Sequence, residues 1–393
     1  MQDPLFWIEE ELKQIHGSNL YRILTEIESG QSPEINIGGK RHILLGSNSY
    51  LGLSVDPKVV EAAKTALDKY GTGSGGSRLV SGSSGLHREL ENRIAEFKNT
   101  EASILFSSGY LANIGTISSL VGPGDIIYSD ELNHASIIDG ARLSRAEIKI
   151  YKHLDMDHLN SLIMEDSGNN CRKLIVTDTV FSMDGDLVDL PKLADISDNH
   201  GCMLMIDEAH ATGVLGERGS GATEYFGVEQ RVPIVMGTLS KAVGSLGGYI
   251  AGSQKLIDYI RNRVRSYIFD TSLPPASLAA SIAAIDIIEN EPERRKYLWE
   301  LIDKFKVGIN DIGLSVLPTS SAIVPVLVED PEPALKFAAV LRENGVFTPA
   351  VRPPSVPPGM CRIRATLMAI HTEEHINRAL RAFELAHAAI HNP

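Results

Sequence analysis

The stretch CMLMIDEAH, residues 202–210, places an apolar run directly before two polar residues. The run 203–206 is apolar at every position, as expected of a strand buried on both faces of a parallel sheet. Asp207 ends the run, and a carboxylate at that point is costly unless it meets a cation. His210 follows where the chain turns away. Because parallel sheets bind ligands beyond the carboxyl ends of their strands, the stretch predicts a site there.

Apolar runs of the same kind alternate with helical stretches from about residue 103 onward. They read SILF, DIIYSD, IKIY, KLIVTDTVFS, PIVMGTLS and GGYIAGS. The alternation predicts an α/β fold with a mostly parallel sheet covered by helices. After about residue 285, a strand–helix–strand–strand–helix series with many prolines indicates a smaller C-terminal α+β domain. We expect an N-terminal helix and hairpin at 1–50, a large domain at 51–285 and a small domain at 286–393.

Local signals predict several elements outside the sheet. Residues 4–28 are expected to form a helix, and EINIGGKRHILLGS at 34–47 a hairpin. The helix at 56–70 has a cap in Asp56, a proline in its first turn and a stop in Gly71. A long helix is expected over 285–311.

Composition excludes several classes of function. The chain has 393 residues, of which 43% are hydrophobic and 22% charged, as in soluble globular proteins. A net charge of −13 argues against a nucleic-acid partner. No apolar run reaches the roughly 20 residues that span a bilayer, so no membrane role is expected. The N-terminus lacks the basic and apolar regions of a signal peptide, and Cys171, Cys202 and Cys361 have no metal or disulfide spacing. We therefore expect a cytoplasmic protein whose cysteines serve in packing.

Three motifs match known sequence signatures but lack the neighbouring elements or motifs that those signatures require. GTGSGG at 71–76 follows a helix, whereas a dinucleotide-binding loop follows a strand, so a flexible loop against a ligand or a neighbouring subunit fits better. DEAH at 207–210 resembles a helicase box, but the chain has no phosphate-binding GxxxxGK[ST] sequence. The histidines include no HExxH, so no metal is expected.

Four polar features remain at the ends of predicted strands. They are Ser108, Gly109 and Tyr110 after SILF; Ser182 after LIVTDTVF; Asp207 and His210; and Thr238, Ser240 and Lys241 after PIVM. Ser108, Gly109 and Tyr110 are expected to begin a helix whose free N–H groups can bind an anion. A simple turn between a strand and a helix would have the same sequence pattern.

Lys241 stands alone in GTLSKAVGSLGG, residues 237–248, among small residues. A single lysine is more often a surface ion-pair partner. Partial burial, however, would disfavour its ammonium form, and the free amine could condense with an aldehyde. With an acidic partner for a pyridine nitrogen and an anion site for a phosphate, the four features together predict a pyridoxal 5′-phosphate site.

Several longer motifs carry a resemblance to a known family: GSGGSRLVSG, NHASIIDG, FSMDGD, DEAHATGVLGERGSG, TLSKA and TSLPP. The chain resembles the α-oxoamine synthases, which are fold-type I pyridoxal-phosphate transferases, from NSYLGL at 48–53 to RIRATLMAIHT at 362–372. The resemblance implies that residues 51–285 bind the cofactor. It also implies the condensation of an amino acid with an acyl thioester, with release of carbon dioxide and the free thiol.

The resemblance implies a role for each matching residue. Lys241 would form the Schiff base and move the Cα proton, Asp207 would face the pyridine nitrogen, and His134 would stack on the ring beside the substrate. His210 and Ser182 would hydrogen-bond the phenolic oxygen. The phosphate would contact Ser108, Gly109, Tyr110, Thr238 and Ser240, together with Thr271 and Ser272 of a partner subunit in a homodimer with shared active sites. The substrates would contact Arg364 through a carboxylate, and also Asn48, Ser355 and Arg22.

Two positions depart from the family pattern: Tyr110 stands where phenylalanine is common, and Arg78 is bulky and charged. Arg78 could contact the acyl donor, but a structural ion pair is favoured slightly. The stretch AVRPPSVPPGMCRIRATLMAIH, 350–371, resembles the family members that use L-alanine and a pimeloyl thioester, and the resemblance implies these substrates. Glycine with acetyl-CoA, an aminotransferase and a non-catalytic binder of the cofactor are the alternatives. The sequence leaves open whether coenzyme A or acyl carrier protein carries the acyl group.

Overall fold

The computed structural model describes residues 3–391, which form two compact units. The larger unit comprises Ser49–Ser182 and Asp186–Tyr297. The smaller unit comprises the segment that ends at Asn48, the segment Met183–Gly185 and the segment that begins at Leu298. Our division at residues 50 and 285 stays a prediction, and its outermost residues, 1–2 and 392–393, lie outside the described part of the chain.

A seven-stranded sheet forms the centre of the larger unit, and each predicted apolar run contributes one strand. In spatial order the strands are β3 (Ala102–Phe106), β9 (Gly248–Gly252), β8 (Ile234–Thr238), β7 (Met203–Asp207), β6 (Lys173–Asp178), β4 (Ile126–Asp130) and β5 (Glu147–Tyr151). β9 runs antiparallel to both neighbours, and the other pairs are parallel. The expected α/β fold is confirmed.

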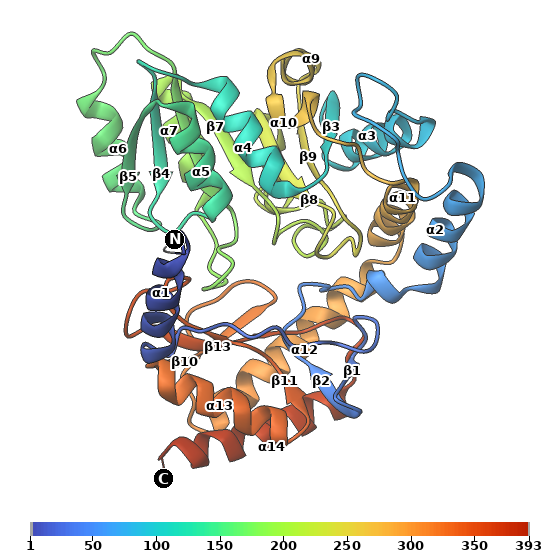
Figure 1. Cartoon of the computed structure of the whole chain (residues 1–393). Helices are drawn as coiled ribbons and strands as arrows, with labels where there is room; N and C mark the ends of the chain where they lie inside the picture. Colours follow the sequence, from blue (N-terminus) through green and yellow to red (C-terminus); the bar gives the residue numbers. More distant parts are fainter. Residues whose placement is uncertain (1–2, 392–393) are drawn as a thin grey trace. The chain divides into compact units, whose positions relative to one another are not determined.

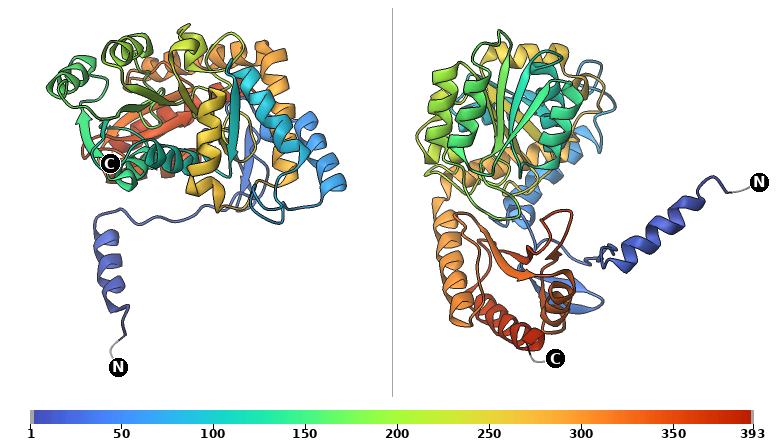
Figure 2. Two further views of the ribbon diagram at one scale, coloured as in Figure 1. Left: turned by 90° about the horizontal axis from the view of Figure 1, so that it is seen from above. Right: turned by 90° about the vertical axis from the view of Figure 1, so that its left-hand side faces the viewer.

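Helices cover both faces of this sheet, as the right-hand view of Figure 2 shows. The helices of the larger unit are α2 (Pro57–Tyr70), α3 (Gly85–Phe97), α4 (Gly109–Leu120), α5 (Ala135–Ser144), α6 (Met156–Glu165), α7 (Leu190–His200), α8 (Ala222–Tyr225), α9 (Gln254–Arg263), α10 (Arg265–Ile268) and α11 (Pro275–Asn290). Short 3₁₀ turns lie at Leu53–Val55 and Glu229–Arg231. α4 packs along α5 and over β8 and β9 (Figure 1). Burial on both faces explains why β4, β8 and β9 are buried at every position.

The helix boundaries show where local sequence signals decide structure. Asp56 caps α2 by accepting from the N–H of Lys58 at 2.9 Å, and Gly71 ends the helix at φ +77°, as predicted. The helix expected over 4–28 is shorter: α1 spans Phe6–Gly17, and Asn19 then adopts a left-handed φ of +56°. No α1 side chain is buried, and both views of Figure 2 show the helix apart from the rest of its own unit. Because no packing extends α1, the apolar residues after it remain irregular.

The smaller unit contains two three-stranded sheets. β1 (Glu34–Ile37) and β2 (Lys40–Leu44) form the predicted hairpin, and β11 (Val346–Phe347) pairs parallel to β2. β13 (Cys361–Thr366) lies between β10 (Ile323–Glu329) and β12 (Ala350–Val351), antiparallel to both. α13 (Pro331–Glu343) and α14 (Glu373–His391) pack together.

The single helix expected over 285–311 is wrong. α11 ends at Asn290 and α12 (Pro292–Asp311) begins at a proline, because proline disfavours helical backbone in the residue before it. Within residues 3–391, none of the helices has both the length and the apolar character needed to cross a membrane.

Candidate active site

The candidate site lies in the larger unit, where β6, β7 and β8 end together. Asp178 and Asp207 are the last residues of β6 and β7, and they are paired in register. Thr238 ends β8, which pairs with β7 on its other side. The strand pairing therefore gathers these polar groups at one edge of the sheet, as the sequence predicted for Asp207 and Thr238.

Asp207 is 4% exposed, and both of its carboxylate oxygens accept a hydrogen bond. The side-chain amide of Asn113 in α4 donates to Oδ2 at 2.7 Å, and the N–H of Ala209 donates to Oδ1 at 2.8 Å. A carboxylate has about four acceptor positions, so Asp207 can accept a further donor. This is the arrangement that a protonated pyridine nitrogen requires. Sequence reasoning missed Asn113, which lies within a helix and has no strand-end signal.

His134 caps α5 and is held by Ser136. Its Nδ1 accepts from the N–H of Ser136 at 3.2 Å and lies 2.8 Å from the hydroxyl of Ser136. Since a backbone N–H can only donate, the proton of the neutral ring is on Nε2. Burial lowers the pKa of His134 and outweighs the opposing charge of Asp207. The imidazole is therefore neutral near pH 7, which suits a ring that stacks on another ring.

Asp178 is a buried carboxyl that sequence reasoning missed. Its Oδ2 accepts from the N–H of His134 at 2.7 Å. Burial and the neighbouring charge of Asp207 raise the pKa of Asp178 well above its usual range. The sequence signal was present, because Asp178 ends the apolar run KLIVTD just as Asp207 ends its own.

His210 and Ser182 lie in the loops after β7 and β6. Nδ1 of His210 is 2.6 Å from the hydroxyl of Tyr50, and both side chains are buried. Tyr50 belongs to NSYLGL, but no role was predicted for it. Ser182 is half-buried near the tip of a turn that the Val180–Leu187 bridge closes.

The first turn of α4 forms a narrow backbone cradle. The hydroxyl of Ser108 caps the helix by accepting from the N–H of Leu111 at 3.2 Å. A Cβ atom on Gly109 would lie 2.7 Å from Cε of Met236, and one on Gly248 would lie 2.5 Å from the nitrogen of Gly109. The backbone contact at Gly248 therefore requires glycine, whereas at Gly109 the flexible end of Met236 would have to shift. The free N–H groups of this turn remain a suitable site for a phosphate.

Thr238, Ser240 and Tyr110 lie around this cradle. The hydroxyl of Thr238 donates to the carbonyl of Gly247 at 2.9 Å and accepts from the N–H of Ser240 at 3.2 Å. The ring of Tyr110 meets that of His134 edge-on, with centroids 6.2 Å apart. Its hydroxyl, the atom that distinguishes it from phenylalanine, donates to Asp139.

Lys241 is half-buried in the turn after β8, where its carbonyl accepts from the N–H of Gly244 at 2.9 Å. Its positive charge helps to lower the pKa of His134 and opposes the rise in the pKa of Asp178. The lysine therefore lies within electrostatic reach of both groups. Lys241, Asp207, Asp178 and His134 thus form one set of interacting groups, as a cofactor site requires.

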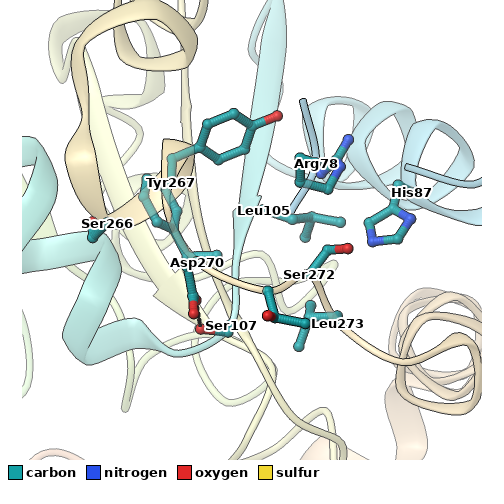
Figure 3. A pocket seen from close by; sticks show the side chains of 11 residues that line it. Arg78, His87, Leu105, Ser107, Ser266, Tyr267, Asp270, Ser272 and Leu273 are labelled. Atoms are coloured by element: carbon teal, nitrogen blue, oxygen red, sulfur yellow. Dashed lines mark hydrogen bonds between the residues drawn. The ribbon is translucent and has the colours of Figure 1, made fainter. Parts of the chain in front are cut away.

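The segment with Thr271 and Ser272 is tied to the glycine loop of its own chain. The hydroxyl of Ser272 donates to the carbonyls of Gly76, at 3.1 Å, and Gly82. Thr271 is exposed and forms a β-bridge with Ser77. Ser272 lies beside a pocket that Figure 3 shows.

Arg78 and His87 also line that pocket (Figure 3). Arg78 donates through two nitrogens to Glu91, at 2.8 and 3.1 Å. Only 10% of the Arg78 side chain is exposed. This paired geometry supports the structural interpretation of Arg78.

The predicted substrate residues lie in the smaller unit. The guanidinium of Arg364 is buried on β13 and donates to Oδ1 of Asn48 at 3.1 Å. Ser355 and Arg22 are exposed. Arg362, two residues before Arg364, donates to the carbonyl of Met183 at 3.1 Å and to Asp184. Sequence reasoning missed this anchor of the FSMDGD segment.

Comparison with known proteins adds to this geometry. Residues 40–383 match the model of the aminotransferase class I and II family. The chain belongs to this family. Among curated members, 8-amino-7-oxononanoate synthase of Geotalea daltonii is 49% identical over 375 residues, covering 95% of each chain. The enzyme of the same name from Symbiobacterium thermophilum is 46% identical over 96% of each chain.

Solved structures of the aminotransferase class I and II fold agree with the present one. Serine palmitoyltransferase of Sphingomonas wittichii has a TM-score of 0.93 at 35% identity, covering 99% of each chain. An 8-amino-7-oxononanoate synthase structure from Francisella tularensis has a TM-score of 0.77 at 29% identity, covering 88% of this chain and 98% of that one. A structure described as SPT with a PLP internal aldimine has a TM-score of 0.93 at 34% identity. This chain therefore has the fold of the fold-type I pyridoxal-phosphate enzymes.

Proposed function

We propose that this chain condenses L-alanine with a pimeloyl thioester in biotin biosynthesis, giving 8-amino-7-oxononanoate, carbon dioxide and the free thiol. One observation carries this function: curated relatives that match 95–98% of the chain at 46–49% identity have the name of that synthase. The enzyme is a pyridoxal-phosphate-dependent acyltransferase.

The residues present fit pyridoxal 5′-phosphate. Asp207 has the acceptor for a pyridinium N–H, and the glycines at 109 and 248 leave room beside the α4 amides. Lys241 is close to Asp178 and His134, as its electrostatic effect on both groups indicates. When bound, the cofactor supplies an electron sink for the electrons of a broken Cα bond. We propose that the ring lies beside Asp207 and that the phosphate lies at the first turn of α4.

Lys241 moves the proton in this proposal. Its Nζ atom would accept the Cα proton of L-alanine and later return a proton to the product carbon. The carboxylate of Asp207 would stabilise positive charge at the pyridine nitrogen, while neutral His134 would cover the ring. Tyr50 orients His210, whose other nitrogen then faces the phenolic oxygen together with Ser182.

Arg364 is the proposed ligand for the substrate carboxylate. A guanidinium binds a carboxylate through two parallel hydrogen bonds, and Asn48 fixes one edge of this guanidinium at 3.1 Å. Ser355 and Arg22 are proposed as substrate contacts on the resemblance alone.

A homodimer with shared active sites is the second part of the proposal. Thr271 is exposed, although Ser77 pairs with its backbone, so its hydroxyl is accessible to a second copy. The phosphate contact by Thr271 and Ser272 of a partner subunit is proposed from the family resemblance. Acyl carrier protein is a proposed carrier of the acyl group, with coenzyme A as the alternative. A cytoplasmic location also stays a prediction.

A competition assay tests the function. Purified enzyme is offered L-alanine and glycine, each with pimeloyl and acetyl thioesters, and carbon dioxide and thiol release are measured. The proposal requires the highest kcat/KM for alanine with the pimeloyl thioester. A preference for glycine with acetyl-CoA would establish the alternative activity. Amino-group transfer to a keto acid without thiol release would establish an aminotransferase.

A further inference from the structure

A fully buried ion pair lies behind the candidate site in the larger unit. Lys98, which follows α3, donates to Oε2 of Glu208, and neither side chain has any exposed surface. The ammonium also donates to the hydroxyl of Thr212 at 3.0 Å and to the carbonyl of Ser220. Its three donors therefore meet three acceptors, which is the full capacity of a lysine.

The carboxylate of Glu208 is fixed on its other side as well. Its Oε1 accepts from the N–H of Thr223 at 2.8 Å, at the start of α8. A Cβ atom on Gly221 would collide with this carboxylate. Burial opposes the charged form of Lys98, but the charges and hydrogen bonds of Glu208 and Tyr249 together outweigh burial and raise the pKa of Lys98. Lys98 is therefore an ammonium ion.

Glu208 directly follows Asp207, at the point where β7 becomes the turn that contains His210. Successive side chains at a strand end point to opposite faces. Asp207 accordingly reaches Asn113 in α4, whereas Glu208 reaches Lys98 beyond α3. The N–H of Glu208 donates to the carbonyl of Met236 at 2.8 Å, and its own carbonyl accepts from Ala211 and Thr212 at 3.0 and 2.9 Å. Glu208 thus anchors the whole 207–212 turn.

We propose that the Lys98–Glu208 pair is a positioning device for the cofactor site, which sets the directions of Asp207 and His210 from the opposite side of the turn. Neither residue touches the reacting atoms. This proposal depends on the proposed function in one respect only, which is that the site binds pyridoxal phosphate. The alternative is that the pair only stabilises the fold. Because breaking a buried ion pair destabilises a protein, the test must separate a loss of stability from a loss of positioning.

The test compares three variants with the holoenzyme at a temperature where each is folded. Lys98→Met leaves Glu208 buried without its cation, so the turn should shift. We expect at least about tenfold weaker binding of pyridoxal phosphate to the apoenzyme and a smaller visible circular-dichroism band. We also expect kcat to fall about tenfold or more, with KM for the amino acid changed less than twofold.

A double variant tests whether the loss of cofactor affinity comes from a displaced turn or from an unpaired buried charge. In Lys98→Met/Glu208→Gln, the glutamine oxygen can accept from Thr223 and its amide can donate to Ser220, so no charge remains unpaired. This variant should recover most of the cofactor affinity and the dichroism band. Thr212→Val removes one hydrogen-bond acceptor of Lys98 and keeps the volume of the side chain at position 212. This variant should lower cofactor affinity and the dichroism band as Lys98→Met does, but by less. It keeps the proposal testable if Lys98→Met does not fold.

A matched control breaks another ion pair of the same unit. Lys149 contacts Asp166 at 2.7 Å, and Lys149 is on β5, at the edge of the sheet. Lys149→Met should lower the melting temperature without changing cofactor affinity, dichroism or kcat. If Lys98→Met likewise lowers only the melting temperature, the pair is structural and the proposal is wrong. Affinity and dichroism need no substrate, so failure of the alanine–pimeloyl reaction would overturn the proposed function alone.

Discussion

Asn113 holds Asp207 through a hydrogen bond of 2.7 Å from its side-chain amide to Oδ2. The same amide nitrogen donates to the hydroxyl of Ser136 at 2.9 Å, and Ser136 in turn holds Nδ1 of His134. The acid proposed for the pyridine nitrogen and the ring proposed to cover it are therefore joined by two intervening side chains. A change at Asn113 should disturb both.

Asn113→Ala should weaken cofactor binding and turnover together. Loss of the amide leaves the buried Oδ2 of Asp207 without this donor, at a cost of about 1–3 kcal/mol. We expect roughly a tenfold or greater loss of pyridoxal-phosphate affinity, measured by absorbance titration of the apoenzyme. Ser119→Ala is the control, because Ser119 lies on the same helix and its hydroxyl donates only to the local carbonyl of Thr116. Equal effects of the two changes would contradict a specific role for Asn113.

Lys241→Ala should abolish turnover and leave the fold intact. Borohydride treatment of wild-type enzyme should fix the cofactor to the peptide that contains residue 241, as mass spectrometry can show. The variant should yield no such peptide and lose the yellow colour. Lys255→Ala, an exposed lysine of α9, should behave as wild type. An active, coloured Lys241→Ala protein would refute the cofactor assignment.

Ionisation of His153 should make stability depend on pH. Its Nδ1 lies 2.9 Å from Asp130 and its Nε2 lies 2.8 Å from Asp186. Burial lowers its pKa, but the hydrogen bonds and charges of the two carboxylates outweigh burial and raise the pKa from 6.5 to about 10. This stabilisation is fully present below about pH 6.5, where the unfolded chain is also protonated, and is lost as the pH rises through about 10.

His153→Gln isolates this contribution. The free energy of unfolding of wild type should fall between pH 6.5 and 10 relative to the variant, by a few kcal/mol, since each pH unit of raised pKa corresponds to about 1.4 kcal/mol. Urea unfolding at a series of pH values measures the difference. Parallel curves for the two proteins would show that folding does not raise the pKa of His153.

Thr271 should act in the active site of a partner subunit. An inactive Lys241→Ala chain mixed with an inactive Thr271→Ala chain should regain partial activity, because one hybrid site has neither change. Ser272→Ala should in addition lower stability, since its hydroxyl donates to Gly76 and Gly82 of its own chain. Absence of recovery after verified subunit exchange would indicate that each site is built from one chain.

The sequence predicted the sheet because burial on both faces makes its strands apolar throughout. It misjudged the region 4–28, where no side chain of α1 is buried and apolar residues alone do not continue a helix. It also merged α11 and α12, although Pro292 separates them.

At the candidate site, strand-end position identified Asp207 and Thr238, which the strand pairing brings to one edge. Asn113, Tyr50 and Lys98 were missed, because their partners Asp207, His210 and Glu208 are distant in sequence. Contacts between residues so far apart in the chain leave no pattern in the local sequence. The proposed roles of the predicted residues stay predictions until the experiments above are done.

The antiparallel strand β9 also has a consequence for biosynthesis of the protein. β3 ends at Phe106 and lies at the edge of the sheet, where its neighbour β9 begins only at Gly248. At about 5–20 residues per second, a ribosome needs on the order of ten seconds to make the intervening chain. During that time the apolar β3 has no native partner, so nascent chains that stop before Gly248 should need chaperones and aggregate without them.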